Sequence, residues 1–459
     1  MDSKAAFLLL LCGLASLSVE AKGPFSSVNS GELGDYIVEY GADYRTVALA
    51  SQTGNFQLVF FNTTPNAFAV AVRMGNFNRA ETMRFVWTAN RNDLVGDNAT
   101  LSFASDGNLV LADADGRLVW STNTSNKGAV GIELRNDGNL VLYDASNRSV
   151  WQSFDHPTDT LLVGQSLGIG GVSKLVSRLS DRDGSEGPYT LVMEAGGLAL
   201  YFNGVPYWTL SFYASELKDL FSITHTCKRA VATITFLSDP DAENGYRQML
   251  EMRLGNSTAP PERRAAALCN LTSDGISTAL YSFTTPRFST TLSFVRLDSD
   301  GNLRMYTYSP QIEYNTWDIT YERFKCGGTG IYGCGLPRKC GSFGLCEKSQ
   351  CVACPQPGGL LGWSDQCSPP VLPNCGTTPA SHVDFYEVVG AEHFSSKYAA
   401  AIGNVKMEEC RRRCLGDCKC AAFFYWEESS KCFLTQSLDT LQQLGNTKHL
   451  AFIKTQTKM

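Results

Sequence analysis

The sequence predicts a mainly β protein in which tandem β domains are followed by small disulfide-rich modules. Glycine is plentiful, with 41 residues, and aromatic residues make up 11% of the chain, a balance that suits short strands joined by tight turns. A DGNLVL hexapeptide recurs in the first half. In the second half, 13 of the 16 cysteines fall between Cys326 and Cys432. Short loops so rich in cysteine need disulfides because they cannot build a sufficient core.

The N-terminus is typical of a signal peptide that spans residues 1–21. Lys4 precedes an apolar run over residues 5–17, and small residues allow cleavage after Ala21. No later segment is apolar enough to span a membrane, and the charged C-terminus does not resemble a lipid-anchor signal. We therefore expect a secreted protein that resides in the extracellular space or the cell wall.

Charge and residue pattern argue against several classes of partner. The formal net charge is −6, and charged residues make up 18% of the chain. Apart from Arg411–Arg413 there is no basic run, so nucleic acid is not an expected partner. The five histidines are scattered without the spacing of metal ligands. We expect no metal and no cofactor.

Six tripeptides match the acceptor pattern for N-linked glycans. In a protein with a signal peptide they predict glycosylated surface loops. The six asparagines are Asn62, Asn98, Asn123, Asn147, Asn256 and Asn270.

The repeats in the first half define a structural unit. Residues 106–111 recur as 137–142, 31 positions later, and a Val-Trp pair follows each copy. A strand, a turn and a second strand cannot bury their own apolar face, so several units must pack around one core. A third Val-Trp pair lies upstream. We expect three units with three tryptophans at the centre: Trp87, Trp120 and Trp151.

These segments carry a resemblance to a known family. VWTANR at 86–91, the two DGNLVL repeats and VWQSFDHPTDTLL at 150–162 resemble the bulb-type lectin domain of S-locus glycoproteins. The resemblance implies a β-prism, with three four-stranded sheets about a pseudo-threefold axis. DGNL at 300–303 indicates a divergent second copy.

The resemblance extends over nearly the whole mature chain. No kinase follows, so the chain resembles the epidermis-specific secreted glycoproteins of plants. It implies four parts after the signal peptide: a bulb-type lectin domain at 22–175, a second lectin-like domain at 176–325, an EGF-like module at 326–370 and a PAN/apple domain at 371–459.

The family's sugar motif is Gln-x-Asp-x-Asn-x-Val-x-Tyr, in which alternate residues share one face of a strand. The copy at 135–143 keeps four of the five positions and has Arg135 in place of glutamine. We expect its side chains to face solvent in one shallow groove. The copy at 104–112 keeps three positions. The candidate sugar-binding residues are Asp137, Asn139, Val141 and Tyr143, followed by Asp106, Asn108 and Val110.

Two further copies are more degenerate. Residues 51–59 keep only Asn55, and the downstream copy has Arg304 where valine belongs. Asp-Gly between apolar runs is also a common hairpin signal. The repeats therefore leave an alternative open, in which DGNL serves only to turn the chain and close the prism.

The expected function is binding of carbohydrate, in particular mannose-type glycans of glycoproteins, without catalysis. The apple module could add extracellular protein partners. The alternative is a protein-binding adaptor, or a receptor-like decoy in the cell wall, whose sugar sites have degenerated. Residues 164–168 match the Gly-x-Ser-x-Gly pattern of hydrolases around Ser166, but Gly170 and Gly171 argue against the helix that such a site requires.

The cysteines predict a scaffold of disulfides. Six are expected to form three bridges inside the EGF-like module, with connectivity left open: Cys334, Cys340, Cys346, Cys351, Cys354 and Cys367. Resemblance to apple modules implies that a short helix at 407–415 is bridged through Cys410–Cys432 and Cys414–Cys420, which leaves Cys375 and Cys418 as a pair. We expect Cys227 to pair with Cys269, and Cys326 to be free or linked to another chain.

Overall fold

In the computed structural model the chain divides into two compact units, residues 1–156 and 157–459. No helix among the described residues has both the length and the apolar character needed to cross a membrane. The structure describes residues 20–75, 82–194, 197–211, 231–239, 247–254, 278–284, 292–308, 317–325, 333–372 and 383–456. Most of the expected signal peptide therefore lies outside the described residues.

The first unit consists of three antiparallel four-stranded sheets. Three strands come first along the chain: β1 (Glu20–Lys22), β2 (Phe25–Val28) and β3 (Asp43–Ala50). Three meanders then join them in reverse order. The first adds β4 (Phe56–Thr64), β5 (Ala67–Met74) and β6 (Arg84–Thr88) to β3; the second adds β7 (Thr100–Phe103), β8 (Leu109–Ala112) and β9 (Leu118–Ser121) to β2; and the third adds β10 (Ala129–Leu134), β11 (Leu140–Asp144) and β12 (Ser149–Gln152) to β1.

The three tryptophans meet at the centre, as the repeats predict. The ring centroids of Trp87, Trp120 and Trp151 lie 5.9 to 6.0 Å from one another, edge to face. In each third strand the valine before the tryptophan has no register partner and forms a β-bulge. A bulge raises the local twist and re-aims the next side chain. The recurring Val-Trp pair is thus explained as a bulge residue followed by a core residue.

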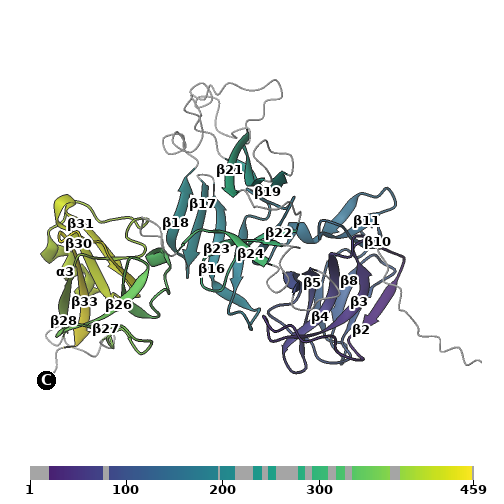
Figure 1. The fold of residues 1–459 in the computed structure, drawn as a ribbon, viewed down its shortest axis with the longest axis horizontal. Coiled ribbons are helices and arrows are strands. Elements are labelled where there is room, and N and C mark those ends of the chain that lie inside the picture. The colour runs from purple at the N-terminus through teal and green to yellow at the C-terminus, as the bar shows by residue number, and fades with distance from the viewer. Residues whose placement is uncertain are drawn as a thin grey trace, which may run out of the picture. The chain divides into compact units, whose positions relative to one another are not determined.

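The second unit begins with another prism of the same connectivity (Figure 1). Its first three strands are β13 (Thr160–Leu162), β14 (Ser166–Gly168) and β15 (Lys174–Arg178). Three meanders again join them in reverse order. They add β16 (Glu186–Glu194), β17 (Gly197–Phe202) and β18 (Val205–Ser211) to β15; β19 (Val231–Asp239), β20 (Arg247–Leu254) and β21 (Thr278–Thr284) to β14; and β22 (Ser293–Leu297), β23 (Leu303–Tyr308) and β24 (Trp317–Glu322) to β13.

This topology confirms tandem β-prisms but moves the boundary between them. The predicted limit at residue 175 is wrong, because β13 pairs with β22 and β14 pairs with β19 inside the second prism. The first unit ends at His156. The DTLL segment at 159–162, which the resemblance places in the first domain, therefore supplies an opening strand of the second.

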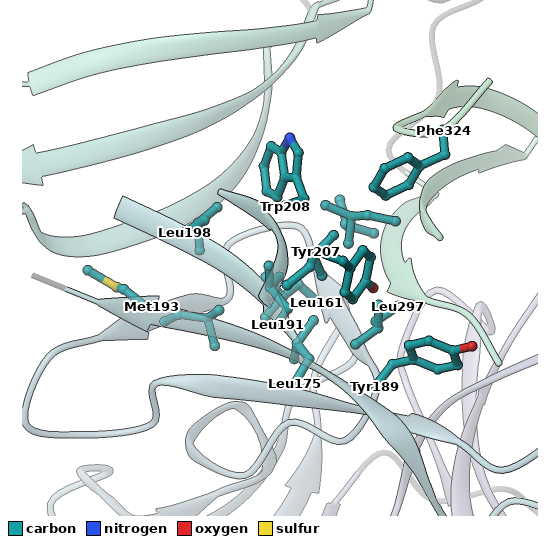
Figure 2. Packing of buried hydrophobic residues seen from close by; sticks show 14 of the residues in the cluster. Leu161, Leu175, Tyr189, Leu191, Met193, Leu198, Tyr207, Trp208, Leu297 and Phe324 are labelled. Atoms are coloured by element: carbon teal, nitrogen blue, oxygen red, sulfur yellow. The ribbon is translucent and has the colours of Figure 1, made fainter. Parts of the chain in front are cut away.

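Aromatic rings fill the core of the second prism. Figure 2 shows Tyr207 between Phe324 and Tyr189, and the ring centroids lie 5.8 and 6.1 Å from that of Tyr207. The Tyr207 hydroxyl donates a hydrogen bond of 2.5 Å to the carbonyl of Gly301, in the turn before β23. Leu336 and Phe394, from the Cys-rich region, belong to the same buried cluster. The prism and the Cys-rich region therefore share one core.

The Cys-rich region forms two sheets and one helix. The EGF-like strands β25 (Phe343–Glu347), β26 (Gln350–Gln356) and β27 (Gly359–Gly362) continue into β32 (Asp439–Gln443) and β29 (Ala391–His393) of the apple domain. The second sheet contains β28 (Val383–Val389), β33 (His449–Gln456), β30 (Ala422–Trp426) and β31 (Lys431–Thr435). Helix α3 (Met407–Gly416) contacts β30 and β31, and it confirms the predicted helix. The two modules are therefore joined through a common sheet.

The disulfides agree with the predicted scaffold. Three bridges lie within the EGF-like module: Cys334–Cys346, Cys340–Cys351 and Cys354–Cys367. Cys410–Cys432 and Cys414–Cys420 are both present. Cys418 is disulfide-bonded. Its expected partner Cys375, and also Cys227, Cys269 and Cys326, lie outside the described residues.

The predicted glycosylation sites differ in exposure. Asn98, Asn123 and Asn147 are exposed and adopt positive φ of 65°, 55° and 60° in the connections between strands. The prediction of a surface loop is wrong for Asn62. This residue lies in β4, is 7% exposed, and accepts a hydrogen bond from the backbone N–H of Asp43. Asn256 and Asn270 lie outside the described residues.

Candidate functional site

The three Asp-Gly-Asn segments form the same hairpin turn. In each, the aspartate Oδ1 accepts the backbone N–H of the asparagine two residues on, at 3.0 Å for Asp106 and Asp137 and 2.9 Å for Asp300. The glycine between them has φ of 84° to 87°, a region that glycine adopts without steric cost. Turn geometry alone therefore accounts for the recurrence of Asp and Gly.

Asn139 does not face solvent, so the prediction of an exposed amide is wrong. Its side chain is 4% exposed. The Nδ2 group donates to Oε1 of Gln152 at 3.0 Å, and Oδ1 accepts hydrogen bonds from the Ser153 hydroxyl and the Phe154 backbone N–H, at 3.3 and 3.2 Å. The chain that leaves β12 closes over the amide. Asn139 therefore holds the end of this hairpin together.

The same role recurs in the other two copies. Oδ1 of Asn108 accepts the backbone N–H of Thr124 at 3.0 Å, and Oδ1 of Asn302 accepts that of Phe324 at 3.0 Å. Asn302 also donates to Oε1 of Glu322 at 2.9 Å, as Asn139 does to Gln152. The motif asparagine is therefore a structural residue in each copy, whatever else it binds.

The face of β11 carries the other motif residues. Val141 lies opposite Glu133 of β10 and Gln152 of β12, and directly opposed residues share a face of the sheet. Val141 is fully buried and Tyr143 is 6% exposed, with its ring against Gly131, where any Cβ would overlap the hydroxyl. These two side chains form an apolar floor.

A polar rim surrounds this floor. Asp137 is exposed. The Nε of Arg135 lies 3.5 Å from Oε2 of Glu133, and the two side chains are 35% and 29% exposed. Gln152 closes the other side and donates to Asp155 at 3.0 Å. In this structure the rim closes over Val141, and we refer to the residues of this face together as the β11 groove: Glu133, Arg135, Asp137, Asn139, Val141, Tyr143 and Gln152.

The sequence motif does not include two residues of the β11 groove. Glu133 and Gln152 come from neighbouring strands, so no spacing within the motif points to them. The hairpin register would have indicated both, because residues flanking Val141 across the sheet must line its face.

The copy on β8 is more open but less complete. Asn108 and Val110 are half-exposed, and Ala112 stands where tyrosine belongs. Asp106 is exposed, and a hydrogen bond from Ser125, together with the Asn108 backbone N–H, lowers the pKa of its carboxyl group. This copy offers polar groups without a closing aromatic ring.

In the copy at 51–59, buried side chains occupy the face that would bind a sugar. Gln57 occupies the valine position, is 1% exposed and accepts a hydrogen bond from Arg73. The Arg73 guanidinium lies 4.7 Å from the centroid of the Tyr44 ring. A buried arginine with these contacts leaves no groove on β4.

The copy on β23 is filled by Arg304, which takes the valine position. Its guanidinium donates to Asp298 at 2.8 Å, to Asp300 at 2.7 Å and to Glu322 at 2.9 Å. Burial alone lowers the pKa of Arg304, but the hydrogen bonds and charges of Asp300 and Asp298 outweigh it and raise the pKa. The Tyr306 hydroxyl donates to Asp298 at 2.8 Å. The Arg304 side chain therefore fills the position that a sugar would occupy on β23.

Ser166 does not have the geometry of a hydrolase nucleophile. It lies in β14, where it pairs with Thr235 of β19, and the two hydroxyl oxygens are 2.8 Å apart. A nucleophile elbow needs a sharp turn between a strand and a helix. Within the described ranges, no cluster of three or more His, Cys, Asp or Glu side chains is arranged to hold a metal ion.

Comparison with known proteins identifies two family matches within the chain. Residues 84–181 match the D-mannose binding lectin family, and residues 375–438 match the PAN-like domain family. The chain is 42% identical to EP1-like glycoprotein 2 of Arabidopsis thaliana, over 99% of this chain and all of that protein. It is 44% identical to the epidermis-specific secreted glycoprotein EP1 of Daucus carota, over 78% of this chain and 90% of that protein.

Among solved structures, part of the chain is similar to a lectin. The Polygonatum cyrtonema lectin, solved with a monomannoside, is 30% identical over 22% of this chain and 70% of that chain, with a TM-score of 0.12.

Proposed function

This chain belongs to the family of EP1-like glycoproteins, and we propose that it is a secreted protein that binds glycans of the mannose type without catalysis. We assign the binding to the β11 groove of the first prism. Support comes from the match to the D-mannose binding lectin family, which covers the β11 hairpin.

One observation carries this choice of site. Among the four copies of the motif, β11 alone combines an apolar floor, formed by Val141 and Tyr143, with an exposed carboxylate at Asp137. A sugar ring has apolar C–H groups on its face and hydroxyl groups at its edge. The floor can pack against the ring, while Asp137 accepts hydrogen bonds from the hydroxyls.

Entry of a sugar requires the rim to open, because Val141 is fully buried. The ion pair of Arg135 and Glu133 is the part of the rim that can move, since both side chains are partly exposed. An exposed ion pair contributes only about 0–1 kcal/mol, so its separation costs little. We infer that the groove opens by rotation of these two side chains.

Arg135 also sets the preference of the groove. Glutamine can donate and accept hydrogen bonds, whereas a guanidinium group only donates. Affinity for mannose is therefore below that of an intact motif, and glycans that carry a carboxylate gain a partner. Because a net hydrogen bond contributes about 1 kcal/mol, binding to one monosaccharide is weak, and useful affinity needs several copies acting together.

A glycan array probed with Tyr143→Phe and the matched variant Tyr306→Phe tests the site. We expect wild type to bind mannose-rich glycans. Tyr143→Phe keeps the apolar ring but removes the hydroxyl that we expect to bond the sugar at the edge of the floor, so it should bind about fivefold more weakly, whereas Tyr306→Phe should bind as wild type does. Equal binding by all three proteins contradicts the assignment to β11. If wild type binds no glycan, the alternative of a protein-binding adaptor or receptor-like decoy replaces the lectin function.

A further inference from the structure

His449 lies where the two sheets of the apple domain meet. It is the first residue of β33, in the four-stranded sheet, and it lies directly opposite Trp426 of β30. Its carbonyl accepts the backbone N–H of Gly390 at 2.7 Å. Gly390 is the single residue between β28 and β29, so the chain crosses there from the four-stranded sheet to the sheet shared with the EGF-like module. The backbone of His449 therefore holds this crossing point.

Both nitrogens of the His449 ring face carboxylate oxygens. Nδ1 pairs with Oε1 of Glu392 on β29, and Nε2 lies 2.5 Å from Oε1 of Glu428, in the turn Glu427–Ser429 that follows β30. The side chains of His449 and Glu392 are 12% and 9% exposed, whereas that of Glu428 is 40% exposed. The imidazole thus bridges a nearly buried carboxylate of the shared sheet and a more exposed one in a turn of the four-stranded sheet.

Aromatic packing restricts this ring. Directly opposed residues share a face of a sheet, and the rings of His449 and Trp426 stack with centroids 4.6 Å apart and planes 9° apart. The Trp426 ring also packs against Phe433 of β31, with 4.7 Å between the ring centroids. Stacking therefore fixes the plane of the imidazole and leaves its two nitrogens directed at the two glutamates.

The two hydrogen bonds of this cluster require two protons shared among three groups. A neutral imidazole has one N–H donor and one acceptor nitrogen, whereas an ionised carboxylate only accepts. Neutral His449 between two ionised glutamates would therefore leave a nitrogen lone pair facing a carboxylate oxygen. One further proton satisfies both contacts, whether it is bound to the imidazole or to Glu392.

The surroundings act on this additional proton in both directions. Burial raises the pKa of Glu392, and the hydrogen bond from His449 and the charge of Lys397 offset this only in part. Hydrogen bonds from its own backbone N–H and from His449 lower the pKa of Glu428. Further charged or polar groups near the cluster are Glu427, Lys431, Asn446 and Lys448. The carboxylates favour the proton, whereas the lysines oppose it and keep it exchangeable.

We propose that His449, Glu392 and Glu428 form a proton-dependent latch between the two sheets of the apple domain. With the additional proton bound, the imidazole ties the turn Glu427–Ser429 to β29. When that proton is lost as pH rises, one contact becomes repulsive, and Glu428 is the partner that moves into solvent because it is the most exposed of the three. Histidine side chains ordinarily change charge between about pH 5 and pH 8. The latch is closed at the lower end of this range and open at its upper end.

Hydrogen–deuterium exchange of the full chain at pH 5.5 and pH 8 tests the latch, with rates corrected for the intrinsic pH dependence of amide exchange. The readout is the protection of the turn Glu427–Ser429. His449→Gln replaces the ring by a polar side chain that does not titrate, and Glu428→Gln removes one charge from a partly exposed position. His156→Gln is the matched control, because His156 also stacks on a tryptophan ring, at 5.3 Å, but lies in the first unit.

In wild type we expect the turn to be about tenfold more protected at pH 5.5 than at pH 8, because charge-assisted hydrogen bonds are lost. His449→Gln should abolish this difference, Glu428→Gln should reduce it, and His156→Gln should retain it. The proposal is overturned if wild type is equally protected at both pH values, if protection is higher at pH 8, or if His449→Gln keeps the wild-type difference. If His449→Gln unfolds the apple domain, Glu428→Gln decides, and an unchanged difference in that variant also overturns the proposal.

Discussion

The hairpins that contain β11 and β23 have the same local structure but differ in the chemistry of the face that carries the motif. Both have the Asp-Gly-Asn turn, a buried asparagine that binds the chain after the next strand, and a bulge in that strand. They differ at the centre of the face, where Val141 forms an apolar floor and Arg304 forms ion pairs with three carboxylates. The prism fold therefore requires the turn and the asparagine. A sugar site depends instead on the position that the fold does not constrain, which Val141 and Arg304 occupy in the two hairpins.

This comparison separates the two interpretations of the repeats. The structural interpretation explains Asp, Gly and Asn in the three Asp-Gly-Asn copies, because each residue has a defined hydrogen bond or backbone angle in the turn. It does not explain Val141 and Tyr143, because β23 keeps the same hairpin with Arg304 in place of the valine. These two positions therefore carry the argument for binding.

The largest effect is expected from the core tryptophans. Trp87 and Trp208 are both 5% exposed and lie at corresponding positions after a bulge in the two prisms. Substitution of each by alanine should cost about 3–5 kcal/mol of unfolding free energy. Calorimetry should show Trp87→Ala lowering one transition and Trp208→Ala another. A single transition that both substitutions lower equally would contradict independent prisms.

The buried asparagines should come next. Asn139→Ala and Asn302→Ala each leave a backbone N–H without its acceptor in a buried site, which should cost about 2–3 kcal/mol. Chemical denaturation of the two variants should give similar losses in the respective prisms. If Asn139→Ala leaves stability unchanged while Asn302→Ala does not, the amide of Asn139 is not the structural residue described here.

Acid should affect the second prism through Asp159. Its side chain is 4% exposed and lies 2.8 Å from Arg178. Burial raises its pKa, but the charges of Arg178 and Arg296 and the hydrogen bonds from Thr160 and Arg178 outweigh this and lower the pKa to about 2. A pKa below the unfolded value of about 3.9 stabilises the fold above that pH, and the stabilisation is lost as pH falls toward 2.

The pH dependence can be measured by thermal unfolding between pH 5 and pH 2. We expect about 2 kcal/mol of stability in the second unit to be lost over this range because of Asp159. Asp159→Asn should remove that part of the pH dependence and leave the first unit unaffected. A variant with the same pH profile as wild type would show that Asp159 does not act in this way.

Much of the fold was predictable because it rests on local patterns. The Val-Trp pairs predicted the central tryptophans, and cysteine spacing with the family resemblance predicted the bridges at Cys410 and Cys414. The burial of Asn139 and of Asn62 was not predictable from the spacing of their motifs, because it depends on the segment after β12 and on the neighbouring strand β3, which lie outside those motifs. The boundary at 175 failed because β13 and β14 pair with strands more than sixty residues away.

The most direct test of the central claim restores the motif in the β11 groove. Arg135→Gln replaces a side chain that only donates by one that also accepts, so it should bind methyl α-mannoside about fivefold more tightly than wild type in an NMR titration. Asp137→Ala should abolish this binding. It should also lower stability modestly, because the turn loses one hydrogen bond. If wild type, Arg135→Gln and Asp137→Ala all bind methyl α-mannoside with equal affinity, the result would contradict a sugar site on β11.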